Sequence, residues 1–500
     1  MFFTPKTFEE FAQLAKQGNV IPVAKKIPAD LLTPVAAYLR LQENNPYTFL
    51  LESIEGGEQV ARYSFLGVKP HLIMRVRGRT VESITNGQVE RLPGTLLDSL
   101  RQYLGQLVPV KLPGLPPFTG GGVGYLNYDM VRWFERIPNK NPDELKIDDA
   151  LIMFFSSILA FDQVKQQLII IVNVFTQRNN VFTQKNTQDL ETKYHNALQE
   201  IAEIEKLLQK PINFSPHQKQ LQSLKVRSNF TKEQFEDAVI KAKEYIKAGD
   251  IFQVVLSQRF EANITSPVFQ IYRALRMINP SPYMFYLGMG EISLIGASPE
   301  MLVRCKDRKL EYRPIAGTRA RGADEVEDAL LGEELRADEK EVAEHIMLVD
   351  LGRNDLGRVS EIGSVEVLDL MTIERYSHVM HMVSKLRSSL RVGSDCFDAL
   401  MACFPTGTVS GAPKVRALEI IDELEPSRRG PYAGAVMYLD YSGNLDSCIA
   451  IRTILVKDDK AYIQAGAGIV ADSVPEKEYI ETVNKARALL KAVEVAEKEL

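Results

Sequence analysis

Short apolar runs separated by glycine and proline turns fill the chain between Val20 and Val174. They include TFLLES, RYSFLGV, HLIMRVRG, LIMFFSSILAF and QQLIIIVNVF, each rich in β-branched or aromatic residues and of strand length. This half is therefore predicted to be β-rich. In the second half, strand-like runs do not alternate regularly with single helices, which favours an α+β fold over a doubly wound parallel sheet.

A polar region from residue 176 to 228 interrupts the pattern. A helix is expected over residues 189–207, and the stretch KPINFSPHQKQLQSLKVRSN after it lacks apolar periodicity. Five hundred residues also exceed the size at which one core usually keeps growing. We therefore predict a β-rich lobe over residues 1–206, a polar connector over 207–228 and a second lobe over 229–500.

The second lobe opens with a helix whose two ends are both signalled. Thr231 and Gln234 have the spacing of a capping box, Gly249 is placed to end the helix, and the strand QVVLSQRF follows. The remaining elements are expected as helices over 325–350, 412–423 and 475–499 and as strands over 293–305, 433–441 and 460–465.

Composition limits the partners and the compartment. The net charge of −5 arises from 60 basic and 65 acidic side chains without a basic stripe, so neither nucleic acid nor a membrane surface is an expected partner. The four cysteines show no CxxC pair and are expected to be buried, reduced thiols. Glu9 and Glu10 interrupt any signal-like apolar start. We expect a cytoplasmic protein.

Four carboxylates form two matched pairs. Glu341 and Glu344 are three residues apart on one predicted helix, and Glu478 and Glu481 have the same spacing on the last helix, so each pair points from one helix face. Each pair could hold a divalent ion such as Mg²⁺, which prefers oxygen ligands. A solvated face, or carboxylates that merely favour a helix N-terminus, is the commoner explanation of such pairs at this point.

Other polar residues stand in apolar or glycine-rich surroundings. GTVSGAPK leads into a helix, and QAGAGIVADS is expected to follow a strand; both can present backbone N–H groups to an anion. Glu300, Arg452 and His381 lie in mostly apolar runs and need partners, as does Gln253 inside its strand. No catalytic triad, nucleotide loop or HExxH is visible. Structural hydrogen bonds are the commoner explanation for Glu300, Arg452 and His381 one by one, and together these residues are compatible with an acidic, anion-binding site.

A series of longer motifs makes the chain resemble the chorismate-utilising enzymes. The motifs are SPEMLV at Ser298, PIAGTRARG at Pro314, EKEVAEHIMLVDLGRND at Glu339, SHVMHMVS at Ser377, FPTGTVSGAPKVRA at Phe404, GPYAGAV at Gly430, AIRT at Ala450 and GAGIVADSVPEKEYIET at Gly466. In the first half LLES at Leu50, RYSFLG at Arg62 and GGVGYLNYDMVRWFE at Gly121 agree. Within this family the chain is similar to the aminase subunits of anthranilate synthases.

The resemblance implies a two-lobed sandwich of large, mainly antiparallel sheets with helices packed outside. It also implies conversion of chorismate and ammonia to anthranilate and pyruvate through 2-amino-2-deoxyisochorismate, the first step of tryptophan biosynthesis. The residues it implies are Glu344 and Glu481, with Glu341 and Glu478, for Mg²⁺; Gly317, Thr318, Tyr432, Arg452, Gly466, Ala467 and Gly468 for chorismate; and Glu300 as general acid with His381 over the ring.

Gln253 distinguishes amination from hydration. Family members that add water carry a lysine at this strand position, whereas ammonia is already nucleophilic and needs no base. The sequence also reads PIAGT, with Ala316 where aminodeoxychorismate synthases carry a lysine thought to attack the ring. No cysteine lies in a nucleophile-elbow setting, so ammonia is expected from a separate glutamine amidotransferase subunit, component II, in a hetero-oligomer.

Feedback inhibition by tryptophan is also implied. The family's inhibitor site matches Glu52, Ser53, Arg62, Pro282, Tyr283 and Met284. Met437 stands where the family usually has glycine, so we expect inhibition to be retained but altered. A sibling enzyme that makes isochorismate, salicylate or aminodeoxychorismate, and an inactive tryptophan-binding regulator, are the alternatives.

Overall fold

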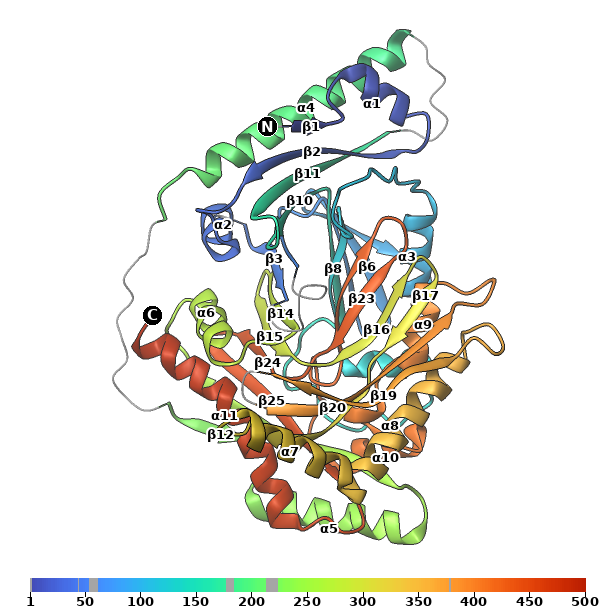
Figure 1. Ribbon diagram of the computed structural model, residues 1–500, viewed down its shortest axis with the longest axis vertical. Coiled ribbons are helices and arrows are strands. Elements are labelled where there is room, and N and C mark those ends of the chain that lie inside the picture. The colour runs from blue at the N-terminus through green and yellow to red at the C-terminus, as the bar shows by residue number, and fades with distance from the viewer. Residues whose placement is uncertain (1, 44, 54–61, 177–183, 213–223, 377–378) are drawn as a thin grey trace.

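The computed structural model describes residues 2–43, 45–53, 62–176, 184–212, 224–376 and 379–500. Two large antiparallel sheets dominate this part of the chain (Figure 1). The first has 13 described strands: β1 (Phe2–Thr4), β2 (Val20–Pro28), β3 (Tyr47–Glu52), β4 (Tyr63–Val68), β10 (Ser157–Asp162), β11 (Gln167–Phe175), β12 (Val226–Ser228), β13 (Gln253–Asn263), β14 (Tyr283–Met289), β15 (Ile292–Ser298), β21 (Gly411–Ala412), β24 (Thr453–Lys457) and β25 (Lys460–Ile469). The second has 12 described strands: β5 (Leu72–Arg77), β6 (Thr80–Thr85), β7 (Gln88–Leu92), β8 (Gly121–Leu126), β9 (Ala150–Phe155), β16 (Met301–Lys306), β17 (Lys309–Tyr312), β18 (Ile315–Ala320), β19 (Glu366–Arg375), β20 (Val379–Ser389), β22 (Ala435–Asp440) and β23 (Leu445–Ile449).

Both sheets contain strands from both halves of the chain. In the first sheet β3 pairs with β14, and in the second β8 pairs with β22, so each sheet runs continuously across the predicted lobes. The α+β class with large antiparallel sheets is thus confirmed. The division at residues 207–228 stays a prediction, and residues 213–223 of that connector lie outside the described part.

Helices cover the outer faces of the sheets. They are α1 (Phe8–Leu14), α2 (Pro34–Leu41), α3 (Leu96–Gly105), α4 (Gln184–Leu208), α5 (Lys232–Ala248), α6 (Val268–Ile278), α7 (Glu325–Ala337), α8 (Glu339–Gly357), α9 (Cys396–Cys403), α10 (Lys414–Leu424) and α11 (Pro475–Lys498), with short 3₁₀ turns η1 (Tyr128–Trp133) and η2 (Gly407–Val409). The predicted capping box of α5 is present, and Gly249 ends that helix in the left-handed conformation. Among the described helices, none is long and apolar enough to cross a bilayer.

The core lies on both faces of the sheets, as β9 illustrates. All six of its residues are buried. Ile152 and Phe154 join the cluster on the helix-covered face of the second sheet, whereas Met153 and Phe155 join the cluster between the two sheets. Burial on both faces explains why these strands read as continuous apolar runs. The four cysteines are free and buried, as expected.

Four predicted elements differ from the structure. The run LIMFFSSILAF contains two strands, β9 and β10, which belong to different sheets, and the expected strand 293–305 is likewise divided into β15 and β16. The expected helix 325–350 is two helices that meet at Asp338, whose carboxylate accepts from the first amides of α8. The glycines of QAGAGIVADS lie within β25, because that strand continues to Ile469.

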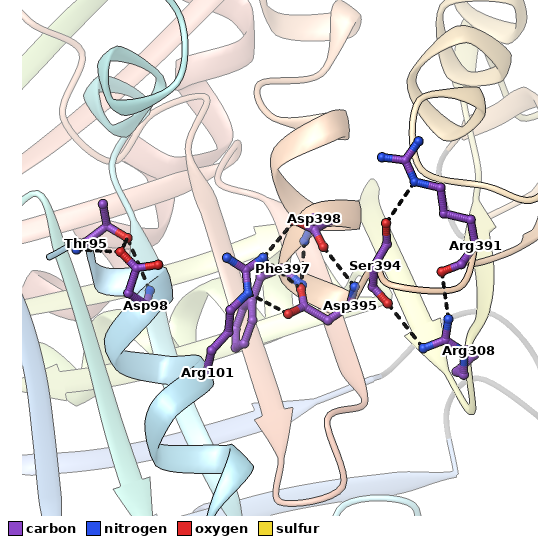
Figure 2. Close-up of polar contacts among 9 residues, drawn as sticks. All are labelled: Thr95, Asp98, Arg101, Arg308, Arg391, Ser394, Asp395, Phe397 and Asp398. Atoms are coloured by element: carbon purple, nitrogen blue, oxygen red, sulfur yellow. Dashed lines mark hydrogen bonds and ion pairs between the residues drawn. The ribbon is translucent and has the colours of Figure 1, made fainter.

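Ion pairs tie α3, from the first half of the chain, to α9 (Figure 2). The guanidinium of Arg101 donates to both carboxylate oxygens of Asp395, at 2.6 and 3.1 Å, and to Asp398 at 2.7 Å. Asp395 also caps the N-terminus of α9 by accepting from Phe397 N and Asp398 N. These contacts link α3, an outer helix from the first half of the chain, to α9 in the second half.

Candidate active site

A cavity of about 560 Å³ lies between helices α8 and α11 and strands β13, β18 and β25. Twelve of the predicted site residues line it: Gln253, Glu300, Gly317, Thr318, Glu341, Glu344, Tyr432, Arg452, Gly466, Gly468, Glu478 and Glu481. They come from segments more than 220 residues apart in sequence. The fold therefore assembles the predicted groups around one space, while His381 and Ala467 do not line it directly.

The two acidic pairs face this cavity from different helices. Glu341 and Glu344 belong to α8, and Glu478 and Glu481 belong to α11. Burial, followed by the negative charge of Glu341, raises the pKa of Glu344. Burial also raises the pKa of Glu478, and the charge of Glu481 adds to that rise. These carboxylates repel one another in a partly buried space, and a bound cation would reduce that repulsion.

The chemistry of these donors fits a magnesium ion, but the carboxylates are not drawn together. Among the described residues, no group of three or more His, Cys, Asp or Glu side chains is arranged to hold a metal. Two carboxylates instead have basic partners: Lys485 Nζ lies 2.7 Å from Glu481 Oε1, and Arg319 Nη1 lies 3.5 Å from Glu341 Oε1. A cation at this site would have to displace these contacts.

Glu300 stands where the chain passes from one sheet to the other. It lies between the end of β15 and the start of β16, and it is 6% exposed. Burial raises its pKa to about 8, and the Thr408 hydroxyl and the Lys485 charge only partly offset the rise. At pH 7 this carboxyl group is mostly protonated, so it can donate a proton.

Gln253 begins β13 at the same cavity. Its side-chain Nε2 donates to Glu344 Oε1 at 3.3 Å, and its Oε1 is buried without a hydrogen-bond partner. Gly468 on the neighbouring strand makes room for the amide, because a Cβ atom there would lie 2.5 Å from Gln253 Nε2. The amide thus has one satisfied donor and one free acceptor in the cavity.

Arg452 and Tyr432 form the part of the wall nearest the glycine-rich end of β25. Arg452 donates to the carbonyl of Lys485 at 2.9 Å, and burial lowers the pKa of its guanidinium. A Cβ atom on Gly466 would lie 2.6 Å from the Tyr432 hydroxyl, so glycine is needed there. Ala467 packs into the core, as expected from the alternation of side chains along a strand. Only its backbone is available for the predicted contact.

His381 lies behind two residues that line the cavity. Its Nδ1 is 3.1 Å from the carbonyl oxygen of Gly317 and 3.1 Å from Thr318 Oγ1. Burial lowers the pKa of the imidazole, which favours its neutral form near pH 7. A neutral ring that donates from Nδ1 to Gly317 is held in one orientation. Ser377 and His378, at the start of the same motif, lie outside the described residues.

Sequence reasoning gave no role to the side chains of four further polar residues of this cavity: Lys340, Lys485, Thr408 and Gln464. Lys485 lies one helical turn beyond Glu481 and also donates to the carbonyl of Gly466 at 3.0 Å. That i,i+4 spacing was a usable signal. Thr408 and Gln464 lie in the stretches GTVSGAPK and QAGAGIVADS, which were singled out for their backbone N–H groups. Nothing local marked their side chains, because the relation of these side chains to the site depends on how distant segments pack.

A second cavity, of about 250 Å³, shares no lining residue with the first. All the predicted inhibitor residues line it: Glu52, Ser53, Arg62, Pro282, Tyr283 and Met284, together with Met437. Glu52 accepts from the Tyr272 hydroxyl at 2.6 Å and from Arg276 Nε at 3.0 Å, so its carboxylate is already paired. Ser53 Oγ is buried without a partner. The cavity therefore offers an apolar space that also presents polar groups, namely the Glu52 carboxylate and the unpartnered Ser53 hydroxyl.

Comparison with known proteins accounts for this arrangement. A family model described as chorismate binding enzyme matches residues 84–491. The chain belongs to the chorismate-binding enzyme family. Its relatives in this family include the anthranilate synthase component 1 of Acetivibrio thermocellus, 49% identical over 98% of each chain, and that of Synechocystis sp., 48% identical over 97% of this chain and 98% of the relative.

Solved structures of the family have the same fold. Anthranilate synthase component I from Streptococcus pneumoniae aligns with a TM-score of 0.73 at 37% identity, covering 93% of this chain and 99% of that one. The menaquinone-specific isochorismate synthase of Escherichia coli aligns with a TM-score of 0.68 at 21% identity, covering 98% and 99%, which supports the fold alone. This chain is thus an enzyme of the chorismate-binding family.

Proposed function

We propose that this chain is the aminase subunit of an anthranilate synthase, a lyase that converts chorismate and ammonia to anthranilate and pyruvate through 2-amino-2-deoxyisochorismate. The observation that carries the proposal is the buried neutral amide of Gln253, which lies in one cavity with Glu300 and both acidic pairs. Near full-length identity of 43–49% to relatives named anthranilate synthase component 1 supports it.

The residues supply the acid chemistry that such a reaction needs. Ammonia forms a bond to the ring while Glu300 gives its proton to the departing ring hydroxyl, which leaves as water, and the added nitrogen then loses a proton. The raised pKa of Glu300 keeps that proton available near pH 7. Arg452, Tyr432 and the β25 amides would hold the second carboxylate of chorismate. His381 would assist the later loss of pyruvate.

Mg²⁺ is the proposed cofactor. Glu344 and Glu481 would hold it, with Glu341 and Glu478 alongside, directly or through water. When bound, the ion neutralises the ring carboxylate of chorismate. The all-oxygen donor set supports this assignment, and the pairing of Lys485 with Glu481 implies that the lysine moves when the ion binds.

The ammonia is proposed to come from glutamine through a separate amidotransferase subunit, in a cytoplasmic hetero-oligomer. The described thiols support this, because burial raises the pKa of Cys305, Cys396, Cys403 and Cys448 and makes each a poor nucleophile. Tryptophan is proposed to occupy the 250 Å³ cavity as an inhibitor.

Product analysis tests the proposal. Purified chain is mixed with chorismate, Mg²⁺ and either ammonium or glutamine, with and without an amidotransferase partner, and anthranilate is followed by its fluorescence. We expect anthranilate from ammonium with the chain alone, and from glutamine only with the partner. Isochorismate, salicylate or aminodeoxychorismate as the sole product, or no product at all, would overturn it.

A further inference from the structure

One edge of β13, behind the wall of the candidate active site, has a gap between two short partner strands, β21 and β12. β21 pairs with Gln253 and Val254, and the carbonyl of Ser410 accepts from Val255 N at 2.9 Å. From there to β12, which pairs with residues 260–262 on the same edge, the polar groups of residues 255–257 meet side chains instead of a strand. A buried strand edge needs such partners, because unpaired backbone groups are costly.

Arg429 and Glu425 supply those partners. The Arg429 guanidinium is 1% exposed and donates to the carbonyl of Val255 at 2.6 Å, to the carbonyl of Val409 at 2.7 Å and to both carboxylate oxygens of Glu425 at 2.9 and 2.6 Å. Glu425 in turn accepts from Ser257 N and Ser257 Oγ, each at 2.8 Å. The ion pair thus takes the place of a strand along residues 255–257.

Three contacts of Arg429 lead to walls of the cavity. Val255 and Val409 line it, and the Arg429 guanidinium lies 5.5 Å from the ring centre of Tyr432, which also lines it. Thr408, the neighbour of Val409, makes a hydrogen bond that lowers the pKa of Glu300. One buried cation therefore touches or adjoins three separate wall segments.

The energetics argue for more than stability. A buried ion pair costs so much desolvation that a hydrophobic pair of similar volume often stabilises a protein equally well. A guanidinium, however, fixes planar geometry through several donors at once, which neither an apolar side chain nor a lysine can do. Arg429 therefore fixes the positions of Tyr432, the η2 turn and β13 relative to one another.

We propose that Arg429 is a positioning residue for the reaction proposed above: it fixes Tyr432 and the Thr408–Val409 turn against β13, and so sets how the substrate carboxylate lies relative to Glu300. The inference rests on the proposed function, because it assumes that the reaction proposed above takes place in this cavity. The positions that Arg429 fixes affect two separate properties: Tyr432 affects substrate binding, and Thr408 affects proton donation by Glu300.

The test compares Arg429→Lys with Arg416→Lys in the full chain. Arg416 lies on α10, pairs with Asp250 and Glu419, and does not line the cavity. For Arg429→Lys we expect the KM for chorismate to rise and kcat to fall, each by about tenfold, since small misplacements at a reaction centre cost this much. Arg416→Lys should match the wild type.

A pH profile separates positioning from simple stability. The titratable groups near Glu300 are Lys485 on α11 and Tyr312 on β17, and the Thr408 hydroxyl is its hydrogen-bond partner. If Arg429→Lys displaces Thr408, the alkaline limb of kcat/KM moves to higher pH. Thr408→Val should reproduce that movement without raising the KM for chorismate.

A second variant guards against loss of folding. The double substitution Glu425→Leu with Arg429→Met removes the buried charges together and leaves no unpaired charge, while Val255 O and Ser257 N lose their side-chain partners. Far-UV circular dichroism and Tm establish that this variant is folded before its kinetics are measured. It should raise the KM for chorismate and move the alkaline limb in the same way. If the folded variants keep the wild-type KM and alkaline limb, whatever their Tm, the proposal is overturned. A different product would refute the proposed function while leaving this comparison intact.

Discussion

Glu300 owes its chemistry to the point at which the chain crosses between the sheets. The carboxyl group lies between β15 and β16, where it is withdrawn from solvent, and burial raises its pKa to about 8. Such a group can donate a proton near neutral pH, and it destabilises the folded state at a pH where it must ionise. Activity and stability should therefore respond to it in opposite directions.

Replacing Glu300 with glutamine should abolish proton donation and remove the cost of ionising a buried carboxyl. We expect kcat to fall by about 10²- to 10⁴-fold. In the wild type the free energy of unfolding should decline as pH rises from 4.5 to about 8, because the unfolded chain releases this proton first. The variant should lack that decline and be more stable by up to roughly 4 kcal/mol at pH 8.

Urea unfolding at pH 5 and pH 8 measures this difference. Glu334→Gln, on the exposed face of α7, is the matched control and should show the wild-type pH dependence. A Glu300→Gln variant that keeps the wild-type decline between those pH values would show that Glu300 is ionised in the native protein.

Gln253 could be identified from the sequence as a buried amide in need of partners, but the partners themselves could not. Glu344 and Gly468 approach it from a helix 91 positions away and from a neighbouring strand. Contacts of this kind depend on strand register and helix placement, which local patterns do not specify. The same limit applies to Thr408 and Gln464.

The unpaired Oε1 of Gln253 is suited to accept an N–H bond of ammonia. Gln253→Met keeps the shape of the side chain and removes that acceptor. We expect the KM for ammonium to rise by about tenfold, in line with the loss of one buried hydrogen bond, with the KM for chorismate nearly unchanged. Initial rates against ammonium and against chorismate measure this. An unchanged KM for ammonium would show that Gln253 does not bind the nucleophile.

At the scale of elements, helix periodicity placed each acidic pair correctly on one face, whereas the ends of α8 and the sheet membership of several strands could not be predicted. Strands buried on both faces show no alternation, so nothing in LIMFFSSILAF marks the change from β9 to β10. The break at Asp338 was concealed because α7 and α8 are both acidic and follow one another without a turn motif.

Asp338 connects helix capping to the proposed cation site. It caps α8 and lies 2.7 Å from Arg319 Nη2, whose other terminal nitrogen is 3.5 Å from Glu341. In Asp338→Ala the guanidinium would be free to pair fully with Glu341 and compete with the ion. We expect the Mg²⁺ concentration for half-maximal activity to rise roughly two- to fivefold, the range that a partly exposed ion pair supplies.

Asp324→Ala is the matched control, because Asp324 caps α7 in the same way without contacting Arg319. It should lower Tm by a similar amount and leave the Mg²⁺ titration unchanged. Equal titrations for the two variants would mean that Arg319 does not compete for Glu341.

At the scale of the whole molecule, two chain segments connect the separate cavities. β16 begins directly after Glu300, which lines the larger cavity, and ends at Lys306, which lines the smaller one; the segment from Cys448 to Arg452 runs between the two cavities as well. Ile449 N donates to the carbonyl of Glu300 at 3.1 Å, which joins the two segments. A ligand that shifts β16 or β23 in the smaller cavity would therefore disturb Glu300 and Arg452.

Met437 is the residue through which this coupling can be tuned. It lines the smaller cavity and is 3% exposed, so truncation to alanine enlarges the space proposed for tryptophan. We expect the Met437→Ala variant to be inhibited at a tryptophan concentration several-fold lower than the wild type requires. Its free energy of unfolding should fall by about 2–5 kcal/mol. Met153→Ala is the matched control, because Met153 is fully buried between the sheets and lines neither cavity. If Met153→Ala sharpened inhibition equally, general loosening would explain the effect, and unchanged inhibition in Met437→Ala would place tryptophan elsewhere.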